Sequence, residues 1–431
     1  MLKRIAAFLL VAALLICAPS CNAIDSIKDT LNGVLNSDAN SIDSHDYMAE
    51  EYDFPEQIGD FKSIERSEYL CYNNLTDSQK QAYDYMYSSA MKMDKALFYV
   101  GECTTDDVTV AFHSLTYDCP YLIWLPSTYG VSEQANGTYV RFVDPDGEYS
   151  YTLSPEERDV HLDELYKEID LFVSQNLHPT MSDYEVELAI HDWICEQTEY
   201  DQDAANAVKS NSEVENPNAW TPYGAIVQNR AVCAGYSKAM QMILNYVGIE
   251  CSSLRVTSRG EMHMVCIVNL GGDWVYADPT WNDKEACGLP FTHDYFNLTY
   301  EEIKATHTVF DSWKDVLSRG EELDSNFNIS VPNSYSNEYN YYKVNGLQIN
   351  SEFDFKTKII TEFNYAVNQG INSLEFQITY CQPTNDTLKD LIDKYDVIDA
   401  FSRRGFNIKG LTYAALNNGA FCIKIDVDKD A

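Results

Sequence analysis

The chain has 431 residues, of which 45% are hydrophobic and 23% are charged, and its formal net charge is −37 at pH 7. This composition excludes an intrinsically disordered protein, and the length exceeds one ordinary hydrophobic core, so we expect two or three domains. The 67 Asp and Glu residues outnumber the 30 Lys and Arg residues, so the surface repels phosphate backbones and no nucleic-acid partner is expected.

Residues 1–23 have the pattern of an export signal. Lys3 and Arg4 precede an apolar run from Ile5 to Cys17, which is too short to span a membrane as a helix. The following sequence, APSC, resembles a bacterial lipoprotein box that ends at Cys21, and cleavage by ordinary signal peptidase is the alternative. We therefore expect an exported protein, which is either a cell-surface lipoprotein anchored through Cys21 or a secreted protein.

Residues 24–60 are rich in Ser, Asp and Asn, which predicts a flexible spacer. Capping residues and a proline then open a series of predicted helices. These helices cover residues 75–93, Thr105 to before Cys119, Pro155 to Asn176, and the segment after Ser182. A polar loop is predicted over residues 203–219.

A helix is predicted from Cys233 to Tyr246, with Gly248 as its stop signal. The hydrophobic period then changes from 3.6 to 2, which predicts strands at residues 250–257, 262–270 and 273–278. Gly271-Gly272 lies between the last two strands and favours a hairpin turn.

From residue 331 the pattern predicts a separate small domain. Strands are expected at 341–349, 374–380, 406–416 and 420–427, with helices at 354–369 and 385–404. Their β-α-β-α-β-β order predicts a small α+β sandwich. The domain boundaries that we expect are therefore 61–330 for a larger α+β domain and 331–431 for the sandwich.

The hairpin register predicts a cluster of chemically useful side chains. With Gly271 and Gly272 at the turn, Asp278 faces Val265 and becomes a diagonal neighbour of His263 on the same face. Cys233 begins a helix, where the helix dipole favours a thiolate. An imidazole lowers the thiol pKa further, and a carboxylate orients that imidazole. Cys233, His263 and Asp278 are therefore the candidate nucleophile, base and orienting acid.

Each of these residues also has a simpler interpretation. A lone cysteine is more often a buried structural residue, so the catalytic interpretation of Cys233 depends on the other two side chains. The backbone N–H of Cys233 is a candidate oxyanion donor, with Trp220 or Tyr223 as side-chain candidates. Cys266 alternates with Val265, so it is expected to point away from His263 and to be structural.

No metal or other cofactor is expected from the sequence. His191, His293 and His307 are too widely spaced to form an HxxxH pattern, and the cysteines contain no CxxC pair.

The chain resembles the transglutaminase-like superfamily, a papain-related group of thiol enzymes, and some outlying segments resemble its bacterial members. The resemblance rests on Tyr223-Gly224-Ala225, Val232 to Ser237, His263, and Tyr276 to Trp281. It implies a papain-like α+β core with a helical N-terminal part and an antiparallel sheet, and a motif core over residues 182–283. It also implies that Cys233, His263 and Asp278 act as nucleophile, base and orienting acid. Val265-Cys266 replaces a Trp-Asn-type pair of the family, which bears on substrate positioning.

These features predict an acyl-transfer enzyme that attacks a peptide or amide bond and forms a thioester at Cys233. Hydrolysis is favoured, because water usually outcompetes an amine unless the cleft excludes it. The alternatives are an amine-accepting cross-linking transglutaminase and a non-catalytic surface module that binds peptide or glycan. The expected partner is a peptide or protein of the cell wall or the environment.

Overall fold

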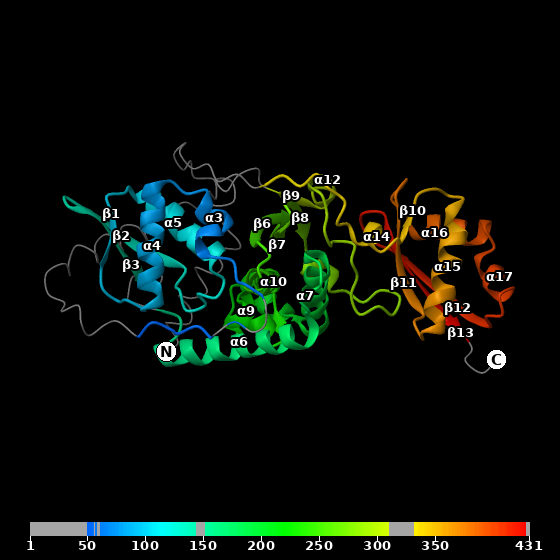
Figure 1. Cartoon of the computed structure of the whole chain (residues 1–431), viewed down its shortest axis with the longest axis horizontal. Coiled ribbons are helices and arrows are strands. Elements are labelled where there is room, and N and C mark those ends of the chain that lie inside the picture. The colour runs from blue at the N-terminus through cyan, green and yellow to red at the C-terminus, as the bar shows by residue number, and fades with distance from the viewer. Residues whose placement is uncertain (1–49, 56, 58–60, 144–150, 310–331, 428–431) are drawn as a thin grey trace. The chain divides into compact units, whose positions relative to one another are not determined.

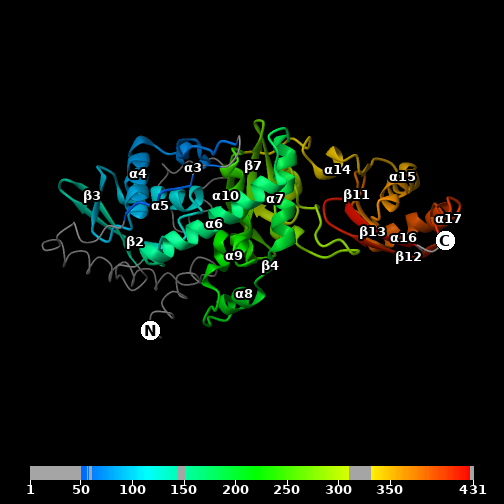
Figure 2. The ribbon, with the colours of Figure 1, turned by 60° about the horizontal axis from the view of Figure 1, so that its bottom comes forward.

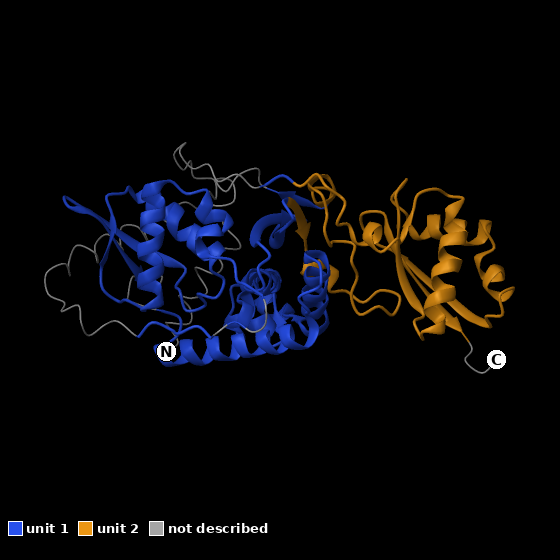
Figure 3. Cartoon of the chain, viewed as in Figure 1, with its two compact units in different colours: residues 1–272, 306–333 blue, residues 273–305, 334–431 orange. Residues whose placement is uncertain are grey.

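The computed structural model describes residues 50–55, 57, 61–143, 151–309 and 332–427. The predicted export signal and most of the predicted spacer lie outside these ranges. Within them, no helix is both long and apolar enough to cross a membrane. The chain divides into two compact units, residues 1–272 with 306–333, and residues 273–305 with 334–431 (Figure 3). The structure is a mixture of helices and sheets, so the predicted α+β class is confirmed.

Three predicted helices of the first unit begin with a capping box, which the sequence predicted at Thr76 and Ser182 but not at Ser154, where Pro155 was the start signal. Thr76, Ser154 and Ser182 each accept a hydrogen bond from the third residue of the following helix. The helices are α4 (Asp77–Met91), α6 (Pro155–Asn176) and α7 (Asp183–Gln197). Helix α5 covers Thr105–Asp118 and is capped by Thr104, one residue earlier than predicted. Local capping chemistry therefore determines these starts.

An antiparallel sheet near α4 and α5 was not predicted from the sequence. Its strands are β1 (Phe98–Gly101), β2 (Thr128–Gln134) and β3 (Gly137–Val143), in the order β1-β3-β2 (Figure 1). The short helices η2 (Arg66–Glu68) and α3 (Leu70–Asn73) precede α4.

The predicted polar loop at residues 203–219 is wrong. Helix α8 (Gln202–Lys209), visible at the bottom of Figure 2, and a 3-10 helix, η3 (Pro217–Trp220), occupy much of it. Asp201 caps α8 by accepting a hydrogen bond from Ala204 N at 2.9 Å, and Ala204 and Val208 form its buried face. Two small apolar residues one turn apart are enough to hold this short helix.

Helix α10 (Cys233–Tyr246) and the sheet beside it follow the prediction closely. The preceding elements are β4 (Glu199–Tyr200), which pairs in parallel with β5 (Arg230–Ala231), and α9 (Pro222–Ile226). The main sheet has the order β8-β7-β6-β9. Its strands are β6 (Cys251–Ser258), β7 (Glu261–Leu270), β8 (Asp273–Ala277) and β9 (His307–Val309). Gly271 and Gly272 have φ values of 62° and 100° between β7 and β8, so the predicted turn is confirmed.

The C-terminal residues form a second sheet with the order β10-β11-β13-β12. The strands are β10 (Gln348–Ile349), β11 (Ser373–Ile378), β12 (Ile408–Ala415) and β13 (Ala420–Val427). The helices are α14 (Tyr341–Val344), α15 (Asp354–Asn368), α16 (Asn385–Lys394) and α17 (Val397–Ser402). The strand predicted at 341–349 is therefore wrong except at its last two residues, because Asn340 caps a helical turn by accepting a hydrogen bond from Lys343 N.

The two faces of this C-terminal sheet differ in chemistry. Phe376, Ile378, Phe421 and Ile423 belong to the apolar core beneath α15–α17 (Figures 1 and 2). The alternating residues of β11 and β13 lie on the opposite face, and they include Glu375, Gln377 and Cys422, all of which are buried. A segment between α11 (Pro279–Asn282) and α12 (Tyr300–Ile303) contacts this polar face, since His293 N donates to Glu375 Oε2 at 3.0 Å.

Asp118, at the end of α5, is a buried carboxylate whose protonation is linked to folding. Its two oxygens accept hydrogen bonds from Cys71 N at 3.1 Å and Tyr72 N at 2.9 Å, and Tyr83 donates to it at 3.3 Å. Burial raises its pKa from the ordinary 3.8 to about 7, because the hydrogen bonds only partly offset desolvation.

We predict that Asp118 makes the protein less stable as pH rises from about 4 to about 7. In this window the folded chain binds more protons than the unfolded chain, so the Asp118 contribution to stability is full below pH 3.8 and is lost as pH passes through about 7. Urea unfolding of the wild type and Asp118→Asn across this range isolates the effect. The difference between their unfolding free energies should fall by up to about 1.4 kcal/mol per pH unit. A constant difference would contradict the linkage.

Candidate active site

Helix α10 is anchored to the main sheet by three polar side chains spaced four residues apart. Ser237 Oγ donates to Met264 O at 3.0 Å. One turn later, Gln241 Oε1 accepts from Ser253 N and Oγ at 3.1 and 2.7 Å. Because residues four apart share one face of a helix, these bonds fix which side of α10 meets the sheet.

The third anchor completes the register between α10 and the strands. Asn245 Oδ1 accepts from Cys251 N at 2.8 Å, and Asn245 Nδ2 donates to Cys251 O at 3.1 Å. Since Cys251 pairs with Val268 and Ser253 pairs with Cys266, each turn of α10 advances about two residues along β7. By the same spacing, Cys233, one turn before Ser237, reaches the level of Met262, the residue before His263 on that strand.

Cys233 is the first residue of α10 and is only partly buried. Val232, which precedes it, caps the helix without a side-chain hydrogen bond, and its carbonyl accepts from Gly235 N at 2.8 Å. The sulfur is thus placed at the positive end of the helix dipole, where a thiolate is stabilised.

The backbone below the cysteine is tightly packed. Val232 N donates to Ala219 O at 2.9 Å, which ties the start of α10 to η3. A Cβ atom added at Gly235 would lie 2.6 Å from both Ala219 O and the Ala231 Cβ. The glycine of the Cys-Ala-Gly-Tyr sequence is therefore required by the close approach of two backbone segments.

His263 lies near the start of β7, opposite Val256 of β6, and is half-buried. Its ring stacks on that of His307 on β9, with 5.4 Å between ring centroids and an angle of 29° between the planes. His307 was not predicted to be part of the site, because it is 44 residues away in the chain and β9 is only three residues long.

Asp278 is the first residue after β8 and is fully buried. Its Oδ1 accepts a hydrogen bond from Trp281 N at 3.1 Å, so it caps α11, and its own N–H donates to Tyr295 O at 2.9 Å. One carboxylate oxygen is thus held by the helix that follows, and the backbone of Asp278 is fixed on both sides.

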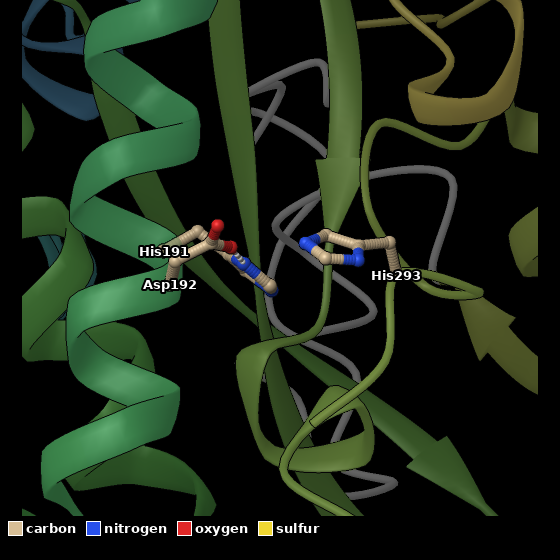
Figure 4. Close-up of side chains that lie close together, drawn as sticks. All are labelled: His191, Asp192 and His293. Atoms are coloured by element: carbon tan, nitrogen blue, oxygen red, sulfur yellow. Dashed lines mark hydrogen bonds and ion pairs between the residues drawn. The ribbon is translucent and has the colours of Figure 1, made fainter. Parts of the chain in front are cut away.

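Two groups of three side chains, each able to offer one metal-ligand atom, occur in the described part of the chain. One consists of His263, Asp278 and His307, and so includes two of the three predicted site residues. The other consists of His191, Asp192 and His293, and Figure 4 shows the imidazole of His191 beside the Asp192 carboxylate. These histidines come from elements that are distant in the chain, so their spacing in the sequence shows no metal-ligand pattern.

The second group also has hydrogen-bond partners from the protein. His191 Nδ1 lies 2.9 Å from Asp192 Oδ1, and His191 Nε2 lies 3.7 Å from Cys195 Sγ. His293 Nδ1 lies 2.9 Å from Glu375 Oε1. Buried imidazoles whose ring nitrogens already have hydrogen-bond partners are consistent with a structural role.

The two side-chain oxyanion candidates differ in their surroundings. Tyr223 donates its hydroxyl hydrogen bond to Glu164 of α6, and burial together with this bond raises its pKa to about 12. That hydroxyl is therefore engaged away from α10. Trp220 is half-buried against the small cluster formed by Ala204, Ala219 and Val232.

Cys266 is fully buried, and its Sγ donates to Ser237 O at 3.3 Å. This contact supports the structural interpretation of Cys266. Because strand side chains alternate, Cys266 and His263 point to opposite faces of β7, as the sequence predicted.

Cys287 is a second partly exposed thiol, and its pKa is lowered by its surroundings. The sequence did not indicate it. A hydrogen bond from the Cys422 thiol lowers the pKa of Cys287, and the nearby positive charge of Lys424 lowers it further. The two cysteines are 135 residues apart, and no local pattern connects them.

Residues 172–279 match the family model of the transglutaminase-like superfamily. Among solved structures, one similar chain is a TGase, with 17% identity and a TM-score of 0.26, over 35% of this chain and 44% of that one. Another is a proposed cysteine protease from Cytophaga hutchinsonii, with 14% identity and a TM-score of 0.22, over 36% of this chain and 61% of that one. This chain therefore spans less than two thirds of either protein. No curated protein matches the chain.

The matched residues contain Cys233, His263 and Asp278, and the chain has a transglutaminase-like core. The predicted transglutaminase-like superfamily is thereby confirmed for residues 172–279. The roles of the three residues stay a prediction.

We predict that Gly235→Ala destabilises the protein by about 1–3 kcal/mol, because the added methyl group would clash with the carbonyl oxygen of Ala219 in η3 and with the methyl group of Ala231 in β5. Gly410→Ala in β12 is a matched control, since its Cβ would meet only the side chain of Asp426, at 3.3 Å. Urea unfolding of both variants measures the difference. Equal stability of the two variants would show that the start of α10 is not tightly constrained.

Proposed function

We propose that the protein is a thiol-dependent acyl-transfer enzyme that attacks peptide or amide bonds, with Cys233 as nucleophile, His263 as base and Asp278 as orienting acid. The acyl group passes to the Cys233 sulfur as a thioester, and the amine leaves with a proton from the imidazole. Water then hydrolyses the thioester and restores the thiol. The substrate is a peptide or protein of the cell envelope or the environment, encountered by an exported chain that is anchored through Cys21 or secreted.

The main support for this proposal is the position of Cys233. It occupies the first residue of α10 and is only partly buried, and the spacing of the three polar anchors directs this end of α10 toward the start of β7, the strand that carries His263. A purely structural cysteine would be expected within the apolar interior, as Cys266 is.

A non-catalytic binding module is the second candidate, and one observation favours it. The side chain of Cys266 faces α10, so regular alternation along β7 directs His263 to the other face. A reaction therefore requires the imidazole to reach the sulfur around the end of the helix. Val265-Cys266 stands where the family has a Trp-Asn-type pair, so this chain lacks the positioning group that the pair would supply.

We predict that iodoacetamide modifies Cys233 selectively at neutral pH. The experiment uses a Cys287→Ser background, because Cys287 is a second thiol with a lowered pKa. The expected rate at Cys233 is about tenfold that at the exposed Cys381, and His263→Ala should remove this advantage because the imidazole that would accept the thiol proton is lost. Peptide mass spectrometry at several pH values gives the rate at each cysteine.

His178→Ala is the matched control, because this histidine is exposed at the end of α6 and should leave the labelling of Cys233 unchanged. If Cys233 reacts no faster than Cys381, or if both histidine variants behave alike, the binding module becomes the better description.

The acceptor of the acyl group is decided by a second experiment. We predict that the protein cleaves or deamidates a mixed protein substrate without incorporating a fluorescent primary amine, because the partly exposed Cys233 sulfur is open to water. Mass spectrometry detects new termini or a mass gain at Gln, and gel fluorescence detects the amine. The new termini and the mass gain at Gln should both be lost in Cys233→Ala. Amine incorporation that requires Cys233 would instead identify a cross-linking transglutaminase.

A further inference from the structure

A pair of thiols lies on the polar face of the C-terminal sheet, outside the proposed active site. Cys422 is on β13, and its alternation with Phe421 and Ile423 directs it away from the apolar core. Its Sγ is buried and donates to Ala414 O on the neighbouring strand at 3.7 Å.

Cys287 is held next to Cys422 by its own loop. A bridge between Ala286 and Leu289 closes a tight turn around it, and Ser373 of β11 donates its hydroxyl to Cys287 O at 2.8 Å. The Cys287 sulfur lies 3.6 Å from the backbone carbonyl oxygen of Cys422, so the two cysteines are neighbours. The loop is therefore fixed to both central strands of the sheet.

We propose that Cys287 and Cys422 are a redox-active pair that forms a disulfide when the protein meets a small-molecule disulfide oxidant. The bond would connect the segment Asp273–Ala305, which carries Asp278, to strand β13. It would use a Cys287 sulfur that already lies 3.6 Å from the backbone carbonyl oxygen of Cys422.

The two cysteines have different chemical environments, which assigns their order of reaction. The hydrogen bond from Cys422 and the charge of Lys424 lower the pKa of Cys287, which is also the more exposed sulfur. The same hydrogen bond and burial raise the pKa of Cys422. Cys287 is therefore the attacking thiol and Cys422 the resolving thiol.

The reaction with oxidised glutathione balances in two exchanges. The Cys287 thiolate attacks one sulfur of glutathione disulfide, forms a mixed disulfide and releases one glutathione thiolate. Cys422 then loses its proton and attacks the Cys287 sulfur, which forms the Cys287–Cys422 bond and releases the second glutathione. Two protein thiols are oxidised, and one molecule of glutathione disulfide is reduced to two thiols.

The test treats the reduced full-length protein with oxidised glutathione, blocks free thiols with N-ethylmaleimide and digests it without reduction. In the wild type, mass spectrometry should find the Cys287 peptide joined to the Cys422 peptide. Cys422→Ser removes the resolving thiol, so glutathione should remain on Cys287 at a level about tenfold above that in the wild type. Cys381→Ser is the control and should leave the cross-link unchanged, because Cys381 is exposed on the chain after β11.

The proposal is overturned if the oxidised wild type carries stable glutathione on Cys287, or if Cys287 pairs with Cys381 instead. The wild-type measurement needs no substitution, so a folding defect in Cys422→Ser would not obscure this outcome. The test uses no substrate and no modification of Cys233. It is therefore independent of the proposed acyl-transfer activity.

Discussion

The candidate site depends on how α10 is attached to the main sheet. Ser237, Gln241 and Asn245 form a polar row along a helix that is otherwise largely buried, and each hydrogen-bonds a strand. Buried polar groups are costly unless paired, so this row permits one register of α10 and disfavours sliding by a turn. The position of the Cys233 sulfur relative to β7 follows from that register.

A second buried polar network organises the segment that carries Asp278. Glu375 accepts hydrogen bonds from His293 N and from Tyr342, and its other oxygen lies beside His293 Nδ1. Asp294, also fully buried, accepts from Lys284 at 2.8 Å and from Asn417 N at 3.0 Å. Removing one partner of such a group leaves an unpaired buried charge, so the network specifies one arrangement.

Sequence patterns predicted the elements that depend on local chemistry. The capping boxes of α4, α6 and α7, the start and end of α10, and the Gly-Gly turn are each specified within a few neighbouring residues. Helix α8 was missed because its apolar face has only two small buried residues. The strand predicted at 341–349 failed because its alternation also fits a helical turn that buries Tyr342.

Cys233 and its helix could be predicted for a similar reason, because a cysteine before a helical period and a glycine stop are local signals. The stacking of His263 on His307 and the pairing of Cys287 with Cys422 could not, because they require knowledge of which strands are neighbours. Short elements such as β9 add to this difficulty, since three residues do not establish a period.

The grouping of the segment 273–305 with the C-terminal residues gives the small sheet a role in the proposed chemistry. Asp278 N donates to Tyr295 O, and the neighbouring His293 and Asp294 are bound by Glu375 and Asn417 of the sheet. Asp278 is therefore held within the second compact unit by a segment that the C-terminal sheet binds. Since a candidate site residue must be held precisely to act, these contacts are the structural support of Asp278 within its own unit.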